Sequence, residues 1–282
     1  MAMYLSTLIA FTVLIIIPDL WYFQKMKKHH FFTWFRYLSL IPGVFFILSL
    51  FYIRFGLVYN NSYKVTAAVS WIIFVFSIIY TPKLLYIVFY YINQSFNRIF
   101  KARTRIFRII GFAFSVSLVT VLSYGVIVTR DDFYLKKQII YVDDLPVNFD
   151  GYRIAMFSDL HLGNWDDKYM IMKPIINMIN SGNPDIIVFS GDMINNYENE
   201  TQGWKPYFRQ LKARQGMYAV LGNHDYGDYT KWKSEKAKAE NLEKTKSNIR
   251  NLGFRLLLNE SVELVKGSDT ITLAGVENYG SD

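Results

Sequence analysis

The sequence predicts two regions of different fold class, a multi-pass α-helical membrane domain in residues 1–130 and an α/β domain in residues 151–282, joined by a connector at 131–150. Hydrophobic residues make up 52% of the chain and aromatic residues 18%, and the excess lies before about Val128. Apolar residues form four long stretches before that point, whereas short apolar strands alternate with helical patterns after it. These observations indicate two regions that fold in two different solvents.

Each of the four apolar stretches is about as long as the roughly 20 residues that cross a 30 Å hydrocarbon core. Basic residues follow the first stretch instead of preceding it, and it has no small-residue cleavage site, which favours a retained helix over a signal peptide. Helices buried in a large soluble core are the alternative, but short basic loops between nearly uncharged runs favour the membrane. The stretches are Tyr4 to Phe23, Phe35 to Phe55, Val65 to Ile92 and Ile106 to Val128.

Three charged residues, Asp19, Arg54 and Lys83, lie at the ends of these stretches or next to Pro82. We expect them at the membrane interface, although a functional charge inside the membrane is the alternative. Pro82 and Lys83 predict that the third helix kinks or leaves the membrane near this point, with the lysine reaching the headgroups.

The formal charge of +8 is spread in a way that does not favour nucleic acid as a partner. Many Lys and Arg residues lie between apolar stretches, and others alternate with Glu on a polar helical stretch from Lys231 to Lys246. The loops Lys25 to Arg36 and Arg98 to Arg108 are strongly basic, so we expect them on the cytoplasmic side of a bacterial cell membrane. Four spans then place the C-terminal domain outside the cytoplasm.

An α/β pattern follows a connector that contains a strand-like patch from Gln138 to Val142. Short apolar strands alternate with helices, which predicts a largely buried sheet flanked by helices. A pair of strands is expected near the end of the chain. The expected elements are the strands Arg153 to Ser158, Ile186 to Ser190 and Met217 to Leu221, the helix Lys168 to Asn180, and the strand pair Glu260 to Val265 and Thr270 to Val276.

Polar residues follow each of the first three strands, where α/β sheets gather their ligands. They are Asp159 and His161 after the first strand, Asp192 after the second, and Asn223, His224 and Asp225 after the third. The chain has no cysteine, so a metal would be held by oxygen and imidazole ligands. Two divalent ions need such ligands together with one bridging carboxylate, and Asp192 on the middle strand suits that position.

The array Asp-x-His, Gly-Asp and Gly-Asn-His-Asp resembles the calcineurin-like metallophosphoesterase family over roughly Tyr152 to Gly280. The resemblance implies an αββα-type sandwich of four layers and a dinuclear site of Mn, Fe or Zn. It implies that Asp159 and His161 bind one metal, Asp192 bridges both and Asn223 binds the other. His224 would donate a proton to the leaving oxygen or stabilise the phosphoryl charge, and Asp225 would orient it in a carboxylate–imidazole pair. The helical anchor resembles the membrane-bound bacterial branch of the family.

The family pattern has further histidines that complete both metal sites, and this sequence lacks them. Its four histidines are His29, His30, His161 and His224, and the first two lie in the predicted cytoplasmic loop. We therefore expect the sequence to be a fragment of a longer protein, with a natural inactive truncation as the alternative. We also expect residues 1–282 alone to bind metal poorly and to hydrolyse phosphodiesters negligibly.

The predicted function of the whole protein is metal-dependent hydrolysis of a phosphodiester or pyrophosphate, with a lipid headgroup as a candidate substrate. The alternatives are a non-catalytic envelope protein that uses a degenerate domain for binding, and a transporter with a regulatory domain. We interpret Asn195, Asn196, Glu198 and Glu200 as a polar loop that would rim the site. Trp165, Tyr226 and Trp232 are candidates to face the substrate, with packing as the favoured interpretation.

Overall fold

The computed structural model describes residues 2–26, 33–59, 63–165 and 168–279, and the side chains of 9–26, 34–52, 68–165 and 169–279. Contacts divide the chain into two compact units, Met1–Asn61 with Ala67–Asp132 and Ser62–Thr66 with Phe133–Asp282. The basic residues 27–32 of the first predicted loop, which include His29 and His30, lie outside the described residues, as does the side chain of Arg54.

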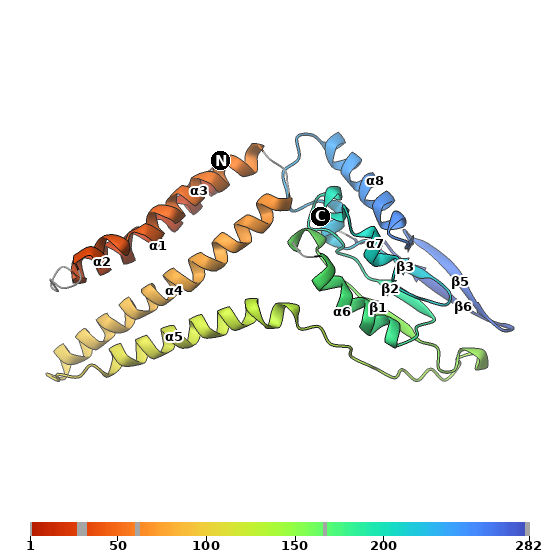
Figure 1. The fold of residues 1–282 in the computed structure, drawn as a ribbon, viewed down its shortest axis with the longest axis horizontal. Helices are drawn as coiled ribbons and strands as arrows, with labels where there is room; N and C mark the ends of the chain where they lie inside the picture. Colours follow the sequence, from red (N-terminus) through yellow and green to blue (C-terminus); the bar gives the residue numbers. More distant parts are fainter. Residues whose placement is uncertain (1, 27–32, 60–62, 166–167, 280–282) are drawn as a thin grey trace. The chain divides into compact units, whose positions relative to one another are not determined.

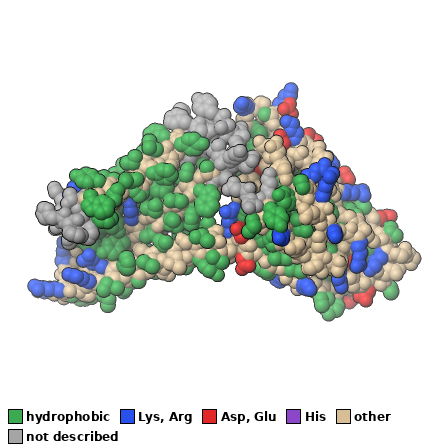
Figure 2. Space-filling view, in the orientation of Figure 1, with side chains coloured by type: hydrophobic (Ala, Val, Ile, Leu, Met, Phe, Trp, Pro, Cys, Tyr) green, Lys and Arg blue, Asp and Glu red, His purple; other side chains and the backbone are tan. Residues whose placement is uncertain are grey.

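The first unit is helical, and its helices match the four apolar stretches (Figure 1). Four of its segments are long and apolar enough to cross a membrane, which confirms the predicted helical membrane region by length and composition. Hydrophobic side chains cover the visible surface of this unit, and Lys and Arg gather where α4 leads into α5 (Figure 2). The helices are α1 (Ala2–Met26), α2 (Thr33–Leu38), α3 (Ile41–Tyr59), α4 (Tyr63–Ile99) and α5 (Ile106–Ile127).

Helix α4 does not end at the predicted break. It continues through Pro82 and Lys83 to Ile99, for 37 residues in all. The Lys83 ammonium does not reach away from the helices, because it lies 2.6 Å from a carboxylate oxygen of the buried Asp19 on α1. The Tyr80 hydroxyl donates to the other oxygen of the same carboxylate, at 2.8 Å. Asp19 and Lys83 are therefore partners of each other inside the helical unit, and their position at the membrane interface stays a prediction.

The second unit contains a parallel sheet in the order β1-β2-β3-β4 and an antiparallel hairpin of β5 and β6. The α/β class predicted for this region is confirmed, and each predicted strand of the sheet is present. The strands are β1 (Ile154–Phe157), β2 (Ile186–Phe189), β3 (Met217–Ala219), β4 (Arg255–Leu256), β5 (Glu260–Lys266) and β6 (Asp269–Gly275). The strand-like patch Gln138 to Val142 forms no strand, and its side chains are exposed.

Alternation along the strands builds a core on each face of the sheet. Ile187 and Phe189 pack on one face with α6 (Lys168–Ser181), α7 (Lys205–Phe208) and α8 (Glu235–Asn251). Ile186 packs on the other face with Leu264 of the hairpin. Successive residues of a strand point to opposite faces, so one buried strand serves both cores. The result is a helical layer, a parallel sheet and a second sheet layer (Figure 1).

Candidate metal centre

Parallel register brings three loops together at one edge of the sheet. Phe157, Phe189 and Ala219 are paired across β1, β2 and β3, and the predicted site residues follow these strand ends. The N–H groups of Asp159 and His161 donate to the carbonyl oxygens of Gly191 and Asp192, at 3.0 and 3.1 Å. The first two loops therefore pair with each other beyond the strands. This pairing positions side chains that are more than 30 residues apart in the sequence.

The backbone at these residues takes the left-handed conformation that L-residues usually avoid. The φ angles are 57° at Asp159, 45° at His161 and 62° at Asp192. Such conformations cost about 1–3 kcal/mol each and cluster at functional sites. Gly191, at φ 102°, has a steric reason as well, because a Cβ there would lie 2.3 Å from the backbone nitrogen of Gly222. The loops after β2 and β3 thus approach more closely than side chains would permit.

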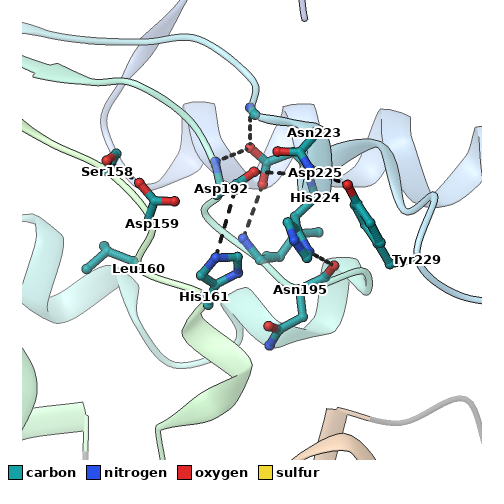
Figure 3. Close-up of polar contacts among 12 residues, drawn as sticks. Ser158, Asp159, Leu160, His161, Asp192, Asn195, Asn223, His224, Asp225 and Tyr229 are labelled. Carbon is teal, nitrogen blue, oxygen red and sulfur yellow. Dashed lines mark hydrogen bonds and ion pairs between the residues drawn. The ribbon is translucent and has the colours of Figure 1, made fainter. Parts of the chain in front are cut away.

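Three ligand-type side chains converge where the loops meet (Figure 3). The ligand atoms of His161, Asp192 and His224 all lie within 4.8 Å of one another. His161 Nε2 is 3.8 Å from a carboxylate oxygen of Asp192, and the two imidazole rings are 4.7 Å apart between centroids. The buried Nδ1 of His161 has no hydrogen-bond partner among the described residues. Two imidazoles beside a carboxylate, with an unpaired nitrogen, are a donor set that fits a divalent transition metal ion.

His224 is held on three sides. Its backbone N–H donates to Asp192 Oδ1 at 3.0 Å, and its ring stacks on Tyr229 with centroids 4.2 Å apart. Its Nδ1 lies 3.0 Å from the carbonyl oxygen of Asn195. A carbonyl oxygen can only accept, so Nδ1 carries the proton and Nε2 of the neutral ring keeps its lone pair. His224 can therefore present Nε2 as a ligand or, once protonated, as a donor.

The predicted pair between Asp225 and His224 is wrong. The buried carboxylate of Asp225 accepts three backbone hydrogen bonds, from Asp192 and Gly222 at 2.9 Å and from Ile194 at 3.1 Å. Burial raises the pKa of this carboxyl to about 6, although the backbone donors oppose the shift. Asp225 therefore joins the loop after β2 to the loop after β3, and the Asn195 carbonyl orients the imidazole.

Asp159 and Asn223 flank the cluster without belonging to it. The Asp159 carboxylate accepts from the Ser158 hydroxyl (Figure 3). The Asn223 amide nitrogen donates to the Tyr229 hydroxyl, which leaves the amide oxygen free of that bond. Both residues have oxygen atoms that can coordinate a hard cation.

Comparison with known proteins agrees with this geometry. Residues 152–281 match the family model described as calcineurin-like phosphoesterase. The second unit contains a calcineurin-like metallophosphoesterase domain. In the metallophosphoesterase domain, the residues brought together are His161, Asp192 and His224, one each from the Asp-x-His, Gly-Asp and Gly-Asn-His-Asp motifs.

Similar proteins carry the same domain name. The chain is 41% identical over 91 residues to the uncharacterized metallophosphoesterase YkuE of Bacillus subtilis, which is 30% of each chain. It is 29% identical over 142 residues to a Danio rerio transmembrane protein with metallophosphoesterase domain, covering 49% of this chain and 30% of the relative. It is 35% identical over 123 residues to the UDP-2,3-diacylglucosamine pyrophosphatase LpxG of Chlamydia trachomatis, covering 41% and 37%. The chain thus spans about a third of each relative, and no solved structure matches it significantly.

The metallophosphoesterase domain has a second buried carboxylate that the sequence interpretation missed. Glu200 accepts from the backbone N–H groups of Asn195, Asn196 and Tyr197, and of Gly163, at 2.7–3.1 Å. A Cβ at position 163 would lie 2.4 Å from a carboxylate oxygen of Glu200, so this contact requires a glycine there. That glycine is the sign of the contact in the sequence. Glu200 thus belongs to the predicted polar loop, but its carboxylate is buried and binds backbone N–H groups. It fixes the loop whose Asn195 carbonyl holds His224.

The three aromatic candidates pack rather than line the cluster. The Trp165 indole N–H donates to the Leu160 carbonyl at 2.7 Å, and its ring packs on the main core, as does Tyr226. The Trp232 indole N–H donates to the Gly227 carbonyl at 2.7 Å, and its ring contacts Tyr197 edge-on. The aromatic residue beside the cluster is Tyr229, which the sequence interpretation did not single out.

Proposed function

We propose that this protein hydrolyses a phosphoester bond with two divalent metal ions, Mn, Fe or Zn, held by residues that follow β1, β2 and β3. The observation that carries the proposal is the approach of His161, Asp192 and His224 within 4.8 Å. Two divalent ions, when bound, would neutralise the phosphoryl oxygens and lower the pKa of a bound water. The metallophosphoesterase domain supports hydrolysis as the reaction class.

Four residues would hold the ions in this proposal. Asp159 and His161 would bind the first, Asp192 would be shared by both, and Asn223 would offer its amide oxygen to the second. The unpartnered Nδ1 of His161 and the Asn223 oxygen left free by Tyr229 support these assignments. The histidines among residues 151–282 are His161 and His224, so we propose that residues 1–282 alone hold the ions weakly and turn over slowly.

His224 would act on the substrate. Its Nδ1–H is committed to the Asn195 carbonyl, so a proton on Nε2 can pass to the leaving oxygen or stabilise the phosphoryl charge. Asp225 supports this role indirectly, because it accepts from the backbone N–H groups of Asp192 and Gly222 and so joins the loops that carry Asp192 and His224.

The substrate in this proposal is a phosphodiester or pyrophosphate carried by a membrane lipid. Four apolar helices would keep the domain at a bilayer, where such substrates are concentrated. Two Chlamydia relatives are named as pyrophosphatases of UDP-2,3-diacylglucosamine, a molecule with two acyl groups. Nucleic acid is not proposed as a substrate.

The domain would face away from the cytoplasm, because the loop that contains Arg98 and Arg108 is basic. The chain has no cysteine, so Lys212→Cys and Arg103→Cys each introduce a single thiol. A membrane-impermeant maleimide should label the first in intact cells and the second only after permeabilisation. The reverse pattern would contradict this orientation.

Metal binding tests the site itself. Binding of Mn²⁺ to residues 1–282 in detergent is measured by electron paramagnetic resonance for wild type and for Asp192→Asn. Loss of the bridging charge should weaken binding at least tenfold. The matched control is Asp228→Asn, which removes an exposed carboxylate that pairs with Lys238. Equal binding by wild type and Asp192→Asn would contradict the proposed site.

Turnover separates the proposed enzyme from a binding protein. Hydrolysis of bis-p-nitrophenyl phosphate with Mn²⁺ is measured for residues 1–282 and for any longer product of the same gene. Turnover by the longer chain that Asp192→Asn abolishes would support the enzyme. Robust turnover by residues 1–282 would show that the ligands present here suffice. Mn²⁺ binding without turnover in the longer chain would favour the binding protein.

A further inference from the structure

A groove in the helical unit has features that the phosphoesterase chemistry does not use. It has a volume of about 760 Å³ and lies along α4 and α5, with Tyr22 of α1 on its wall. The two helices touch at Gly111, where a Cβ would lie 2.4 Å from Phe89 Cβ, and at Ser115. The Ser115 hydroxyl is 2.8 Å from the Gly111 carbonyl oxygen of its own helix and 3.2 Å from the Pro82 carbonyl oxygen of α4. The groove therefore has a fixed floor. Its described lining residues are Tyr22, Pro82, Lys83, Tyr86, Arg105, Arg108, Ile109, Phe112, Ser115, Val116, Val119 and Thr120.

The described lining of the groove carries three cations and no carboxylate. Lys83 is neutralised from outside the groove by Asp19 at 2.6 Å. Arg105 and Arg108 form no ion pair among the residues that the structure describes. Arg108 is half-buried, its Nε has no hydrogen-bond partner there, and its Nη2 is 3.5 Å from the Tyr86 hydroxyl. Two guanidinium groups without a counter-ion are complementary to a phosphate.

Charge and apolar surface are separated along one face of α5. The successive lining residues from Arg105 to Thr120 are one or three positions apart, which places them on a single helical face. Arg105 and Arg108 lie at its start, at the positive end of the helix dipole. Ile109, Phe112, Val116 and Val119 follow over about 15 Å, close to the half-thickness of a hydrocarbon core. A phospholipid has the same arrangement, with a charged headgroup at one end followed by an apolar acyl chain.

We propose that this groove binds one anionic phospholipid, with its phosphate between Arg105 and Arg108 and an acyl chain along Phe112, Val116 and Val119. A free phosphate would leave the apolar wall unused, and a zwitterionic lipid would bring a choline or ethanolamine cation towards the arginines. Basic pockets between membrane helices suit anionic headgroups for this reason. The lipid would link α4 and α5 beyond their contacts at Gly111 and Ser115.

Lipid binding to the full chain in detergent tests the charged end of the groove. Native mass spectrometry counts bound phosphatidylglycerol and phosphatidylcholine, and titration gives the affinity for each. Wild type should bind one phosphatidylglycerol at least tenfold more tightly than phosphatidylcholine. Arg105→Gln with Arg108→Gln should abolish this preference. The control, Arg98→Gln with Arg103→Gln, removes the same charge from the end of α4 and the segment after it, outside the groove, and should keep the preference.

A second pair of variants tests the apolar end without changing charge. Val116→Trp fills the groove and should weaken phosphatidylglycerol binding at least tenfold. Val121→Trp places the same ring on the exposed side of α5, outside the groove, and should leave binding unchanged. Equal loss in both arginine pairs would overturn the proposal in favour of general surface attraction. Unchanged binding in Val116→Trp, or displacement of the lipid by millimolar glycerol phosphate, would overturn it as well.

Discussion

Buried carboxylates in the two units are stabilised in different ways. Asp19 in the helical unit is compensated by side chains, the Lys83 ammonium at 2.6 Å and the Tyr80 hydroxyl at 2.8 Å. Asp225 and Glu200 in the metallophosphoesterase domain accept backbone N–H groups. The difference follows from the surrounding backbone. Helix interiors donate their N–H groups to their own carbonyls, whereas loops after strands leave N–H groups free.

This contrast decides which substitutions each unit tolerates. A substitution can remove a partner's side chain, so the stability of the buried Asp19 carboxylate depends on which residues occupy positions 80 and 83. Main-chain N–H groups are supplied by every residue except proline, so the environment of Asp225 is insensitive to its neighbours' side chains. The carboxylate that organises the site loops can therefore be disturbed mainly by changing the carboxylate itself.

The largest effect is expected from Lys83→Met. Removing the cation leaves the buried Asp19 carboxylate without its charge partner, which should cost about 3–5 kcal/mol. Thermal unfolding of the full chain in detergent measures the loss. Asp19→Asn combined with Lys83→Met should recover most of it, because no buried charge then remains. A double variant as unstable as the single one would show that the pair does not stabilise through charge compensation.

Asp225→Asn should have the next largest effect. The amide keeps one acceptor and points its NH₂ group at backbone donors, so about 2–3 kcal/mol should be lost locally. Hydrogen exchange followed by mass spectrometry should show faster exchange at Asp192, Ile194 and Gly222. Asp228→Asn, in an exposed position, is the control and should leave these amides protected.

The pH dependence sharpens the same prediction. Burial raises the pKa of Asp225 to about 6, so its protonation stabilises the metal-free fold below about pH 4, and this contribution is lost as the pH rises through 6. The difference in stability between wild type and Asp225→Asn should therefore be larger at pH 5 than at pH 8. A difference that grows with pH would show that the backbone donors outweigh the burial.

Those parts of the site whose chemistry depends on the identity of a side chain could be predicted from the sequence. His161, Asp192 and His224 follow apolar strands, so their meeting at one edge could be inferred from parallel topology, whereas the metal-binding roles of Asp159 and Asn223 stay predictions. The role of Asp225 could not be inferred, because its partners are main-chain groups that leave no signature in the sequence. The pairing of Asp19 with Lys83 could not be predicted either. The two residues are 64 positions apart, and their contact depends on how α1 and α4 align.

The fold was predicted where burial gives a strong pattern. β1, β2 and β3 carry continuous apolar runs, and α6 carries a helical stripe. Strand β4 was missed because two residues, Arg255 and Leu256, are too few to show a period. The patch Gln138 to Val142 shows the opposite failure. Ile139 and Ile140 have strand propensity, but the described structure gives them no partner strand.

The smallest effect is expected from Tyr229→Phe, and it tests whether side chains also contribute near the backbone-held site. The ring can still stack on His224, but the Asn223 amide loses the hydroxyl that accepts from it. Asn223 should then rotate more freely, and Mn²⁺ binding should weaken about two- to fivefold through a lost hydrogen bond of about 0.5–1 kcal/mol. Tyr229→Leu, which also removes the stacked ring, should weaken binding further. If Tyr229→Phe and Tyr229→Leu both bind Mn²⁺ as wild type does, the backbone alone positions the ligands, and the contrast between the two units is sharper than these contacts suggest.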